Sequence, residues 1–313
     1  MNPALSIIIP SFHLGPYLKE AVLSSLAQET TYQYEVIIYL SLDKNEDASY
    51  LEELKKSYPF LKIIYNYDKP TNPFLSRYLA AKQAEGKYLS FLDNDDLLKP
   101  NFVEKMVRTL EETNSDLIQC GFAYLKKNKE KNTLLRRNKI YDQKQAMLGL
   151  LRDSYIRGFF WNKVYKKDLF FKSPSLLFLE DGYLFEDVGF NFSYFFKARK
   201  IITIKDVLYV YRKQSQSLTS TKRVTNRSEA HLLIFILFDY FLRKNDQALL
   251  PLLKKGKFRS YLSLKYDLYR DKKNQASKKY LKEIKTLFKL LYKEGSTCKE
   301  ITNHYPDLAK HLS

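Results

Sequence analysis

The chain has 313 residues, enough for one large domain or two ordinary ones, and 45% of them are hydrophobic, which is ample for a buried core. Its formal net charge is +18, from 53 Lys and Arg against 35 Asp and Glu. The two cysteines, Cys120 and Cys298, lie far apart, which excludes a disulfide framework and a thiolate metal site and favours a reducing compartment.

The first residues lack the basic segment and the long apolar core of a signal peptide. The longest later apolar run, residues 232–242, is interrupted by Asp239 and is shorter than the ~20 residues that a spanning helix needs. We therefore expect a cytoplasmic protein whose chain does not cross a membrane.

Strands and helices alternate through the first hundred residues. Apolar runs of strand length occur at residues 5–10, 35–40, 61–65 and 88–92, and helical periodicity separates them, around residues 16–26, 51–58 and 74–79. This alternation predicts an α/β fold with a mostly parallel sheet flanked by helices. In such sheets ligands bind at the carboxyl ends of the strands.

The fourth predicted strand ends in a cluster of acids, Asp93-Asn94-Asp95-Asp96. Crowded carboxylates repel one another, and this spacing puts Asp93 and Asp95 within reach of one divalent cation. The alternative is an Asx turn in which Asp95 or Asp96 caps the next helix. Residues 97–100 are predicted to form the turn into that helix, which should span about residues 101–113.

A fifth strand is expected at residues 116–124, and the basic residues 126–139 after it should form an exposed loop or hairpin tip. Residues 159–165 are dense in aromatics and include the only tryptophan, Trp161. This aromatic segment fits a core cluster or a platform on which a sugar ring stacks.

A second acidic cluster, residues 180–187, precedes a helix that should run through Phe196. Its Glu186 and Asp187 either stabilise the helix dipole or act in chemistry. An aromatic strand at residues 208–213 then ends in Arg212 and Lys213. Taken alone, Arg212 fits a solvated strand end and Arg77 a surface ion pair on its helix.

The positive charge is concentrated in the C-terminal region. Residues 222–313 carry 21 Lys and Arg against 9 Asp and Glu, whereas residues 1–221 carry 32 against 26. Residues 281–292 repeat apolar side chains at helical spacing with lysines between them. Such a helix either lies in an anionic membrane interface or packs on the preceding domain with its lysines in water.

Together these motifs resemble the family 2 inverting glycosyltransferases with a GT-A fold. The resemblance covers about residues 5–220 and depends on the order of its motifs: Ile7-Ile8-Ile9-Pro10, an acidic loop after the second strand, Arg77, Phe91-Leu92-Asp93-Asn94-Asp95-Asp96, Glu186-Asp187 and Tyr209-Val210-Tyr211-Arg212. It implies a GT-A catalytic domain at residues 1–221, followed by a basic helical region at residues 222–313.

The resemblance also implies roles for single residues. Asp93 and Asp95 would hold Mn²⁺ or Mg²⁺, with Asp95 as the direct ligand, and Asp187 would be the catalytic base, with Glu186 and Asp181 as local rivals. Side chains expected beside the nucleotide sugar are Pro10, Ser11, Asp43, Arg77, Asn94 and Arg212, with Ser217 in the segment that closes over the diphosphate. We add Glu186 and Trp161 as candidate binding residues.

The chain departs from the family pattern at three places, and at the first of them His13 replaces a common Asn. Asp43, which would recognise the base, uracil, follows Leu42 instead of a second acid, after an apparent two-residue insertion. Tyr78 replaces the Asn that usually follows the Arg. These departures predict an unusual donor preference.

The chemistry of sugar transfer explains why the site needs carboxylates. The bond at the anomeric carbon breaks through an oxocarbenium-like transition state while negative charge grows on the departing diphosphate. A hard cation on Asp93 and Asp95 can neutralise that charge, and Asp187 can take the proton of the acceptor hydroxyl. Single displacement predicts inversion. The expected acceptor is a cell-surface glycan, a teichoic-acid-like polymer or a glycolipid, reached from the inner face of the membrane.

Two other classes remain open. A sugar nucleotidyltransferase usually carries a Gly-rich basic loop after the first strand, but residues 11–15 hold one Gly and no Lys or Arg. A non-catalytic basic module would bind membrane or nucleic acid, but no nucleic-acid motif is present and the acidic clusters would repel phosphates. Release of UDP from UDP-sugars would separate the transferase from both.

Overall fold

The computed structural model describes residues 2–42, 46–67, 73–133, 138–151, 156–173, 186–214, 238–239 and 241–253. The strands are β1 (Leu5–Ser11), β2 (Tyr34–Ser41), β3 (Leu61–Asn66), β4 (Tyr88–Phe91), β5 (Leu97–Leu98), β6 (Leu117–Lys126), β7 (Lys129–Asn132), β8 (Lys139–Tyr141), β9 (Lys163–Lys166) and β10 (Ile201–Arg212). The helices are α1 (Leu18–Leu26), α2 (Ser49–Ser57), α3 (Pro73–Lys82), α4 (Phe102–Thr113), α5 (Gln143–Leu151), α6 (Lys167–Lys172), α7 (Glu186–Lys197) and the 3₁₀ helix η1 (Gln247–Leu253).

These strands form one sheet in the order β3-β2-β1-β4-β9-β6-β10-β5, with β7 beside β6 and β8 beside β10. The pairs among β3, β2, β1 and β4 are parallel, as is the pair β6–β10, which confirms the predicted mostly parallel α/β fold. Each residue of β1 is buried, as expected for an apolar strand flanked by two parallel neighbours.

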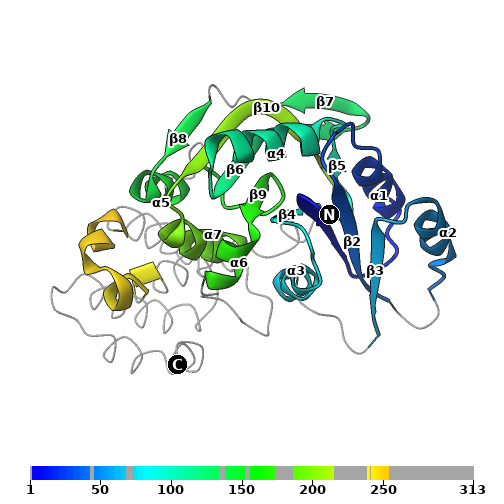
Figure 1. Ribbon diagram of the computed structural model, residues 1–313, viewed down its shortest axis with the longest axis horizontal. Helices are drawn as coiled ribbons and strands as arrows, with labels where there is room; N and C mark the ends of the chain where they lie inside the picture. The colour runs from blue at the N-terminus through cyan, green and yellow to red at the C-terminus, as the bar shows by residue number, and fades with distance from the viewer. Residues whose placement is uncertain are drawn as a thin grey trace, which may run out of the picture.

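Helices cover both faces of the sheet (Figure 1). Along β1, Ile7 and Ile9 pack with α1, α2 and α4, whereas Ile8 faces the opposite way and packs with α3, α5, α6 and α7. Side chains alternate across a strand, so an uninterrupted apolar run buries both of its faces. The three layers leave the carboxyl ends of β1, β4, β6 and β10 at one edge of the sheet.

Three local predictions differ from the structure. Residues 97–98 were expected in a turn but form β5, which pairs antiparallel with β10. The last strand begins at Ile201, seven residues earlier than its aromatic segment indicated. The antiparallel strand β9, inserted between β4 and β6, was not predicted, since its four residues begin and end with lysine.

The basic hairpin was predicted correctly. β6 and β7 pair antiparallel, with Lys126 opposite Lys129. The two residues between them, Lys127 and Asn128, have φ of 48° and 58°, the conformation that a two-residue hairpin turn requires. Several other predictions lie outside the described residues: the boundary at 221–222, Asp43, Asp181, Ser217 and the lysine-rich helix at residues 281–292.

Candidate functional site

The loops after β1 and β4 are tied together at the carboxyl edge of the sheet. The Asn94 side-chain amide donates a 2.7 Å hydrogen bond to Ser11 Oγ, and Ser11 Oγ donates to the His13 carbonyl. Pro10, buried in β1, lies immediately before this contact. The structure therefore brings together three residues that the sequence placed beside the nucleotide.

Arg77 connects the two acidic clusters. It extends from α3, is only 8% exposed, and its Nη2 lies 2.6 Å from Asp93 Oδ1 after β4. Its Nη1 lies 3.8 Å from Glu186 Oε1 in the first turn of α7. The guanidinium also lies over the Phe160 ring, 5.2 Å from its centroid. Arg77 is thus a buried link and not the surface ion pair that was the alternative.

Asp96 anchors the end of β10 to the acid loop. It is fully buried, and it accepts a hydrogen bond of 2.7 Å from the Tyr209 hydroxyl and another of 2.7 Å from the Arg212 backbone N–H. The next helix, α4, has Asn101 at its N-cap and no side-chain cap hydrogen bond. Capping by Asp95 or Asp96 is therefore excluded.

Arg212 reaches across the same loop. Its Nε donates to the Asp95 carbonyl at 2.8 Å, and its Nη2 lies 2.7 Å from Glu20 Oε2 on α1. The guanidinium also covers the Tyr17 ring at 4.1 Å. This strand end is therefore ordered by partners from the first helix and is not simply solvated. Sequence reasoning missed Glu20 and Tyr17, because nothing in the pattern of α1 marks a contact across the sheet.

The Asp95 carboxylate lies in a position that disfavours its charge. Burial and the nearby Asp93 raise the pKa of Asp95 to about 6, although Arg212 and a 2.6 Å hydrogen bond from the Gln214 side chain oppose this. Among the described residues no group of three or more His, Cys, Asp or Glu is arranged to hold a metal ion.

Asp187 lies in the first turn of α7, is partly buried, and accepts a 2.8 Å hydrogen bond from the Val188 N–H. Burial, and then the neighbouring Glu186, raise the pKa of Asp187 to about 7. A carboxyl group with a pKa near neutrality can take a proton from the attacking hydroxyl during the reaction and release that proton afterwards. This pKa fits the role of catalytic base that the resemblance implies for Asp187, and that role stays a prediction.

Trp161 is 7% exposed and packs within a set of aromatic rings. Its ring stacks on Phe159 at 4.6 Å, on Tyr209 at 4.6 Å and on Tyr211 at 5.5 Å between centroids. Core packing accounts for these contacts, so a role of Trp161 in binding a sugar stays a prediction.

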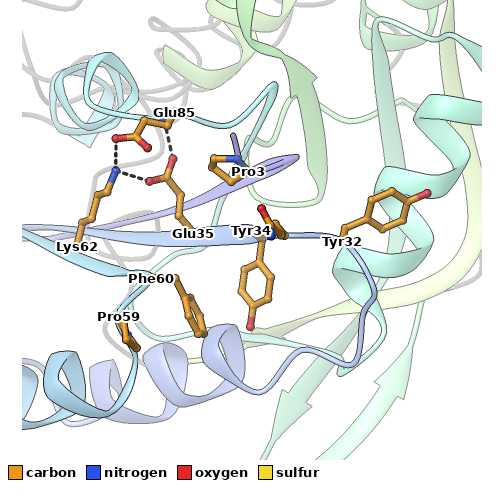
Figure 2. A pocket seen from close by; sticks show the side chains of 9 residues that line it. Pro3, Tyr32, Tyr34, Glu35, Pro59, Phe60, Lys62 and Glu85 are labelled. Carbon is orange, nitrogen blue, oxygen red and sulfur yellow. Dashed lines mark hydrogen bonds and ion pairs between the residues drawn. The ribbon is translucent and has the colours of Figure 1, made fainter. Parts of the chain in front are cut away.

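A cavity of about 440 Å³ lies at the opposite edge of the sheet, at the amino ends of β1, β2 and β3 (Figure 2). Its lining residues are Pro3, Tyr32, Gln33, Tyr34, Glu35, Pro59, Phe60, Lys62 and Glu85. Lys62 Nζ lies 2.8 Å from Glu35 and 2.7 Å from Glu85, as the dashed lines in Figure 2 show. The cavity is remote from every predicted site residue that the structure describes.

Glu35 in this cavity is structural. Its Oε1 accepts hydrogen bonds from Ser6 Oγ and the Glu85 N–H, both at 2.6 Å, and from the Gly86 N–H at 3.2 Å. Burial alone would raise the pKa of Glu35, but the hydrogen bonds from Lys62, Ser6 and the Glu85 backbone hold it below its ordinary value. The carboxylate thereby joins β2 to β1 and to the turn before β4.

We expect Glu35→Gln to lower the free energy of unfolding by about 1–3 kcal/mol, because buried N–H and O–H donors lose a charged acceptor. Denaturant titration measures this loss. Since the folded-state pKa is lowered, the stabilisation is present above the ordinary pKa of Glu and is lost as pH falls through the lowered value. Glu85→Gln is the matched control, since that side chain is 62% exposed. An equal loss in both variants would contradict the structural role of Glu35.

No helix in the described part of the chain is both long and apolar enough to span a bilayer.

Comparison with known proteins adds a family and a fold. The family model described as Glycosyl transferase family 2 matches residues 6–183. The uncharacterized glycosyltransferase EpsJ of Bacillus subtilis is 26% identical over 227 residues, 70% of this chain and 64% of EpsJ. A cholesterol galactosyltransferase of Borreliella burgdorferi is 24% identical over 239 residues, 73% of this chain and 65% of that protein. The chain therefore spans just under two thirds of the length of these relatives.

Solved structures of S. aureus TarS share the fold. TarS 1-349 matches with a TM-score of 0.63 and 18% identity, over 83% of this chain and 72% of TarS 1-349. The same protein in complex with UDP-GlcNAc matches with a TM-score of 0.61 and 18% identity, over 99% of this chain and 81% of that one.

Proposed function

Because the chain belongs to glycosyl transferase family 2, we propose that it transfers a sugar, as a hexosyltransferase, from a nucleotide diphosphate donor to an acceptor hydroxyl. The observation that carries the proposal is the position of Arg77, which links Asp93 at the end of β4 to Glu186 at the start of α7. In this proposal the loop after β4 binds the donor diphosphate, and the first turn of α7 brings the base to the same site. The complex of TarS with UDP-GlcNAc supports UDP as the nucleotide.

In the proposed reaction Asp187 takes the proton from the acceptor hydroxyl. The acceptor oxygen forms its bond to the anomeric carbon as the bond from that carbon to the diphosphate breaks, and the electron pair leaves with the nucleoside diphosphate. Attack opposite the leaving group inverts the anomeric centre. Asp187 therefore has to be ionised when the acceptor binds, and its pKa near 7 allows this at neutral pH.

Asp93 and Asp95 are proposed to hold Mn²⁺ or Mg²⁺ with oxygens of the donor diphosphate. Two carboxylates at one loop suit a hard cation whose other ligands come from phosphate and water. The raised pKa of Asp95 fits this, because a cation would offset the repulsion from Asp93. When bound, such an ion neutralises negative charge on the leaving diphosphate.

The remaining candidates are proposed to hold the donor. Backbone and side chains around Pro10, Ser11 and Asn94 would lie beside the nucleoside, and Arg212 would face the diphosphate loop. The acceptor is proposed to be a cell-surface glycan, teichoic-acid-like polymer or glycolipid, and the relative in Borreliella burgdorferi, a cholesterol galactosyltransferase, is compatible with a lipid acceptor. Membrane association of residues 222–313 stays a prediction from their charge.

The test is a thermal-shift titration with UDP, GDP and CDP, each with and without Mn²⁺, on wild type and on Asp95→Ala. A ligand that binds only the folded state at 100 times its Kd stabilises it by about 2.7 kcal/mol. We expect UDP to raise the melting temperature of wild type in a Mn²⁺-dependent way, and Asp95→Ala to remove that dependence. If no nucleotide shifts wild type, the proposed function is wrong and the basic region becomes the feature to study.

A further inference from the structure

Residues 93–96, which follow β4, form a tight turn that carries the two carboxylates proposed to meet the donor diphosphate. The Asp96 N–H donates to the Asp93 carbonyl at 3.1 Å, which closes the turn along the backbone. The shape of this turn decides where the Asp93 and Asp95 carboxylates lie, and repulsion between the two charges opposes any shape that brings them together. Arg77 pairs with Asp93 at one end of the turn, and the structure shows a second support inside it.

The Tyr209 hydroxyl provides that support, because it bridges the two ends of the turn. It accepts the Asp93 N–H at 3.2 Å and donates to Asp96 Oδ2 at 2.7 Å. The other Asp96 oxygen accepts the Arg212 N–H at 2.7 Å. Asp96 has no solvent exposure, and losing a donor to a buried carboxyl group is costly, so both hydrogen bonds hold it in place.

The Tyr209 ring is itself held firmly. It is fully buried in β10, where Tyr209 lies between Leu98 of β5 and Phe122 of β6. The ring stacks on Trp161 with 4.6 Å between centroids and 26° between the planes. Close packing of this kind leaves few rotamers open, so the hydroxyl keeps one position relative to the turn.

We propose that Tyr209 is a positioning residue for the donor, and that its hydroxyl, acting with Asp96, fixes the turn in the shape in which Asp93 and Asp95 meet the diphosphate. The inference rests on the proposed function. It gives the three acids of the turn different roles: Asp96 makes its contacts inside the protein, whereas Asp93 and Asp95 serve the donor. Loss of the Tyr209 hydroxyl should therefore weaken donor binding and leave acceptor binding as it was.

The first experiment compares wild type with Tyr209→Phe, which removes the hydroxyl and keeps the buried ring. Calorimetry measures the Kd of UDP at one Mn²⁺ concentration, and release of UDP from a UDP-sugar measures the KM of the donor and of the acceptor. We expect the Kd of UDP and the donor KM to rise about tenfold, the size of one net hydrogen bond, with an unchanged acceptor KM. A merely structural loss would lower the active fraction, and so kcat, without changing the Kd of UDP, and that result would overturn the proposal.

Tyr194→Phe is the matched control, because it loses the same kind of bridge elsewhere. Tyr194 is also fully buried, and its hydroxyl accepts the Lys166 N–H at 3.0 Å and donates to the Asp116 carbonyl at 2.6 Å. These contacts lie at the amino ends of β4 and β6, away from the turn. We expect the melting temperature of Tyr194→Phe to fall and its Kd for UDP to stay at the wild-type value. Equal weakening of UDP binding in both variants would contradict a positioning role for Tyr209.

Asp96→Asn and the double variant test whether the Tyr209 hydroxyl acts through Asp96. Both single changes break the same hydrogen bond, so the double variant should bind UDP no more weakly than the weaker single variant. Losses that multiply would overturn the proposal. Should Asp96→Asn fail to fold, the comparison of Tyr209→Phe with Tyr194→Phe still decides. Absence of UDP binding by wild type would overturn the proposed function and this inference with it, whereas equal binding by wild type and Tyr209→Phe would overturn this inference alone.

Discussion

Asp187→Asn should abolish sugar transfer and leave donor binding nearly intact. The amide keeps the shape of the side chain and can still accept the Val188 N–H, but it cannot take a proton from the acceptor hydroxyl. General-base catalysis is worth about 10²–10⁴ in rate, so we expect a fall of that size in kcat. Release of UDP from a UDP-sugar with acceptor measures the rate, and the thermal shift caused by UDP measures binding.

The matched control tests whether any acid in a first helical turn would give the same result. Asp168 occupies the first turn of the neighbouring α6 and is exposed to solvent. Asp168→Asn should leave transfer unchanged. Loss of both transfer and UDP binding in Asp187→Asn would identify Asp187 as a structural acid, and loss of transfer in Glu186→Gln alone would assign the base to Glu186.

The edge of the sheet was predictable because its signals are local. The change from an apolar strand to Asp93-Asn94-Asp95-Asp96 marks the end of that strand in the sequence. Parallel strands bring such ends to one edge of the sheet. Arg77 was placed near this loop through its position in the motif order, and the structure pairs it with Asp93. The apolar runs also marked β1 to β4 to within one residue at nearly every end.

The contacts that were not predicted depend on the tertiary arrangement. Asp96 looked like a helix cap, but β10 returns to this loop and supplies the Tyr209 hydroxyl and the Arg212 N–H as its partners. Lys163 lies in the aromatic segment that was expected to form a core cluster or a sugar platform, but that pattern did not predict that β9 inserts between β4 and β6 and buries the lysine completely. A sequence pattern carries no information about which distant strand inserts beside another.

Removal of the guanidinium that joins the two acidic clusters is expected to have the second large effect. Arg77→Met keeps the apolar stem but leaves Asp93 and Glu186 without their shared cation. Breaking a buried ion pair costs about 3–5 kcal/mol, and since the Asp93 side chain is 28% exposed we expect roughly 2–3 kcal/mol in denaturant titration. Transfer should fall about 10²-fold or more, because a small displacement of either loop misplaces the donor against the base.

Two further variants complete this test: one is a control at an exposed arginine, and the other separates the charge of Arg77 from its geometry. Arg108→Met removes an arginine that is 44% exposed and pairs with Glu104 and Glu112 on its own helix, so stability and transfer should change little. Arg77→Lys keeps the charge, but an ammonium is a point charge and cannot reach Asp93 and Glu186 in the way that two Nη atoms do. We therefore expect Arg77→Lys to recover part of the stability and little of the transfer. Full transfer in Arg77→Lys would show that the site needs only a positive charge here, and full stability in Arg77→Met would show that the two clusters are held together by other contacts.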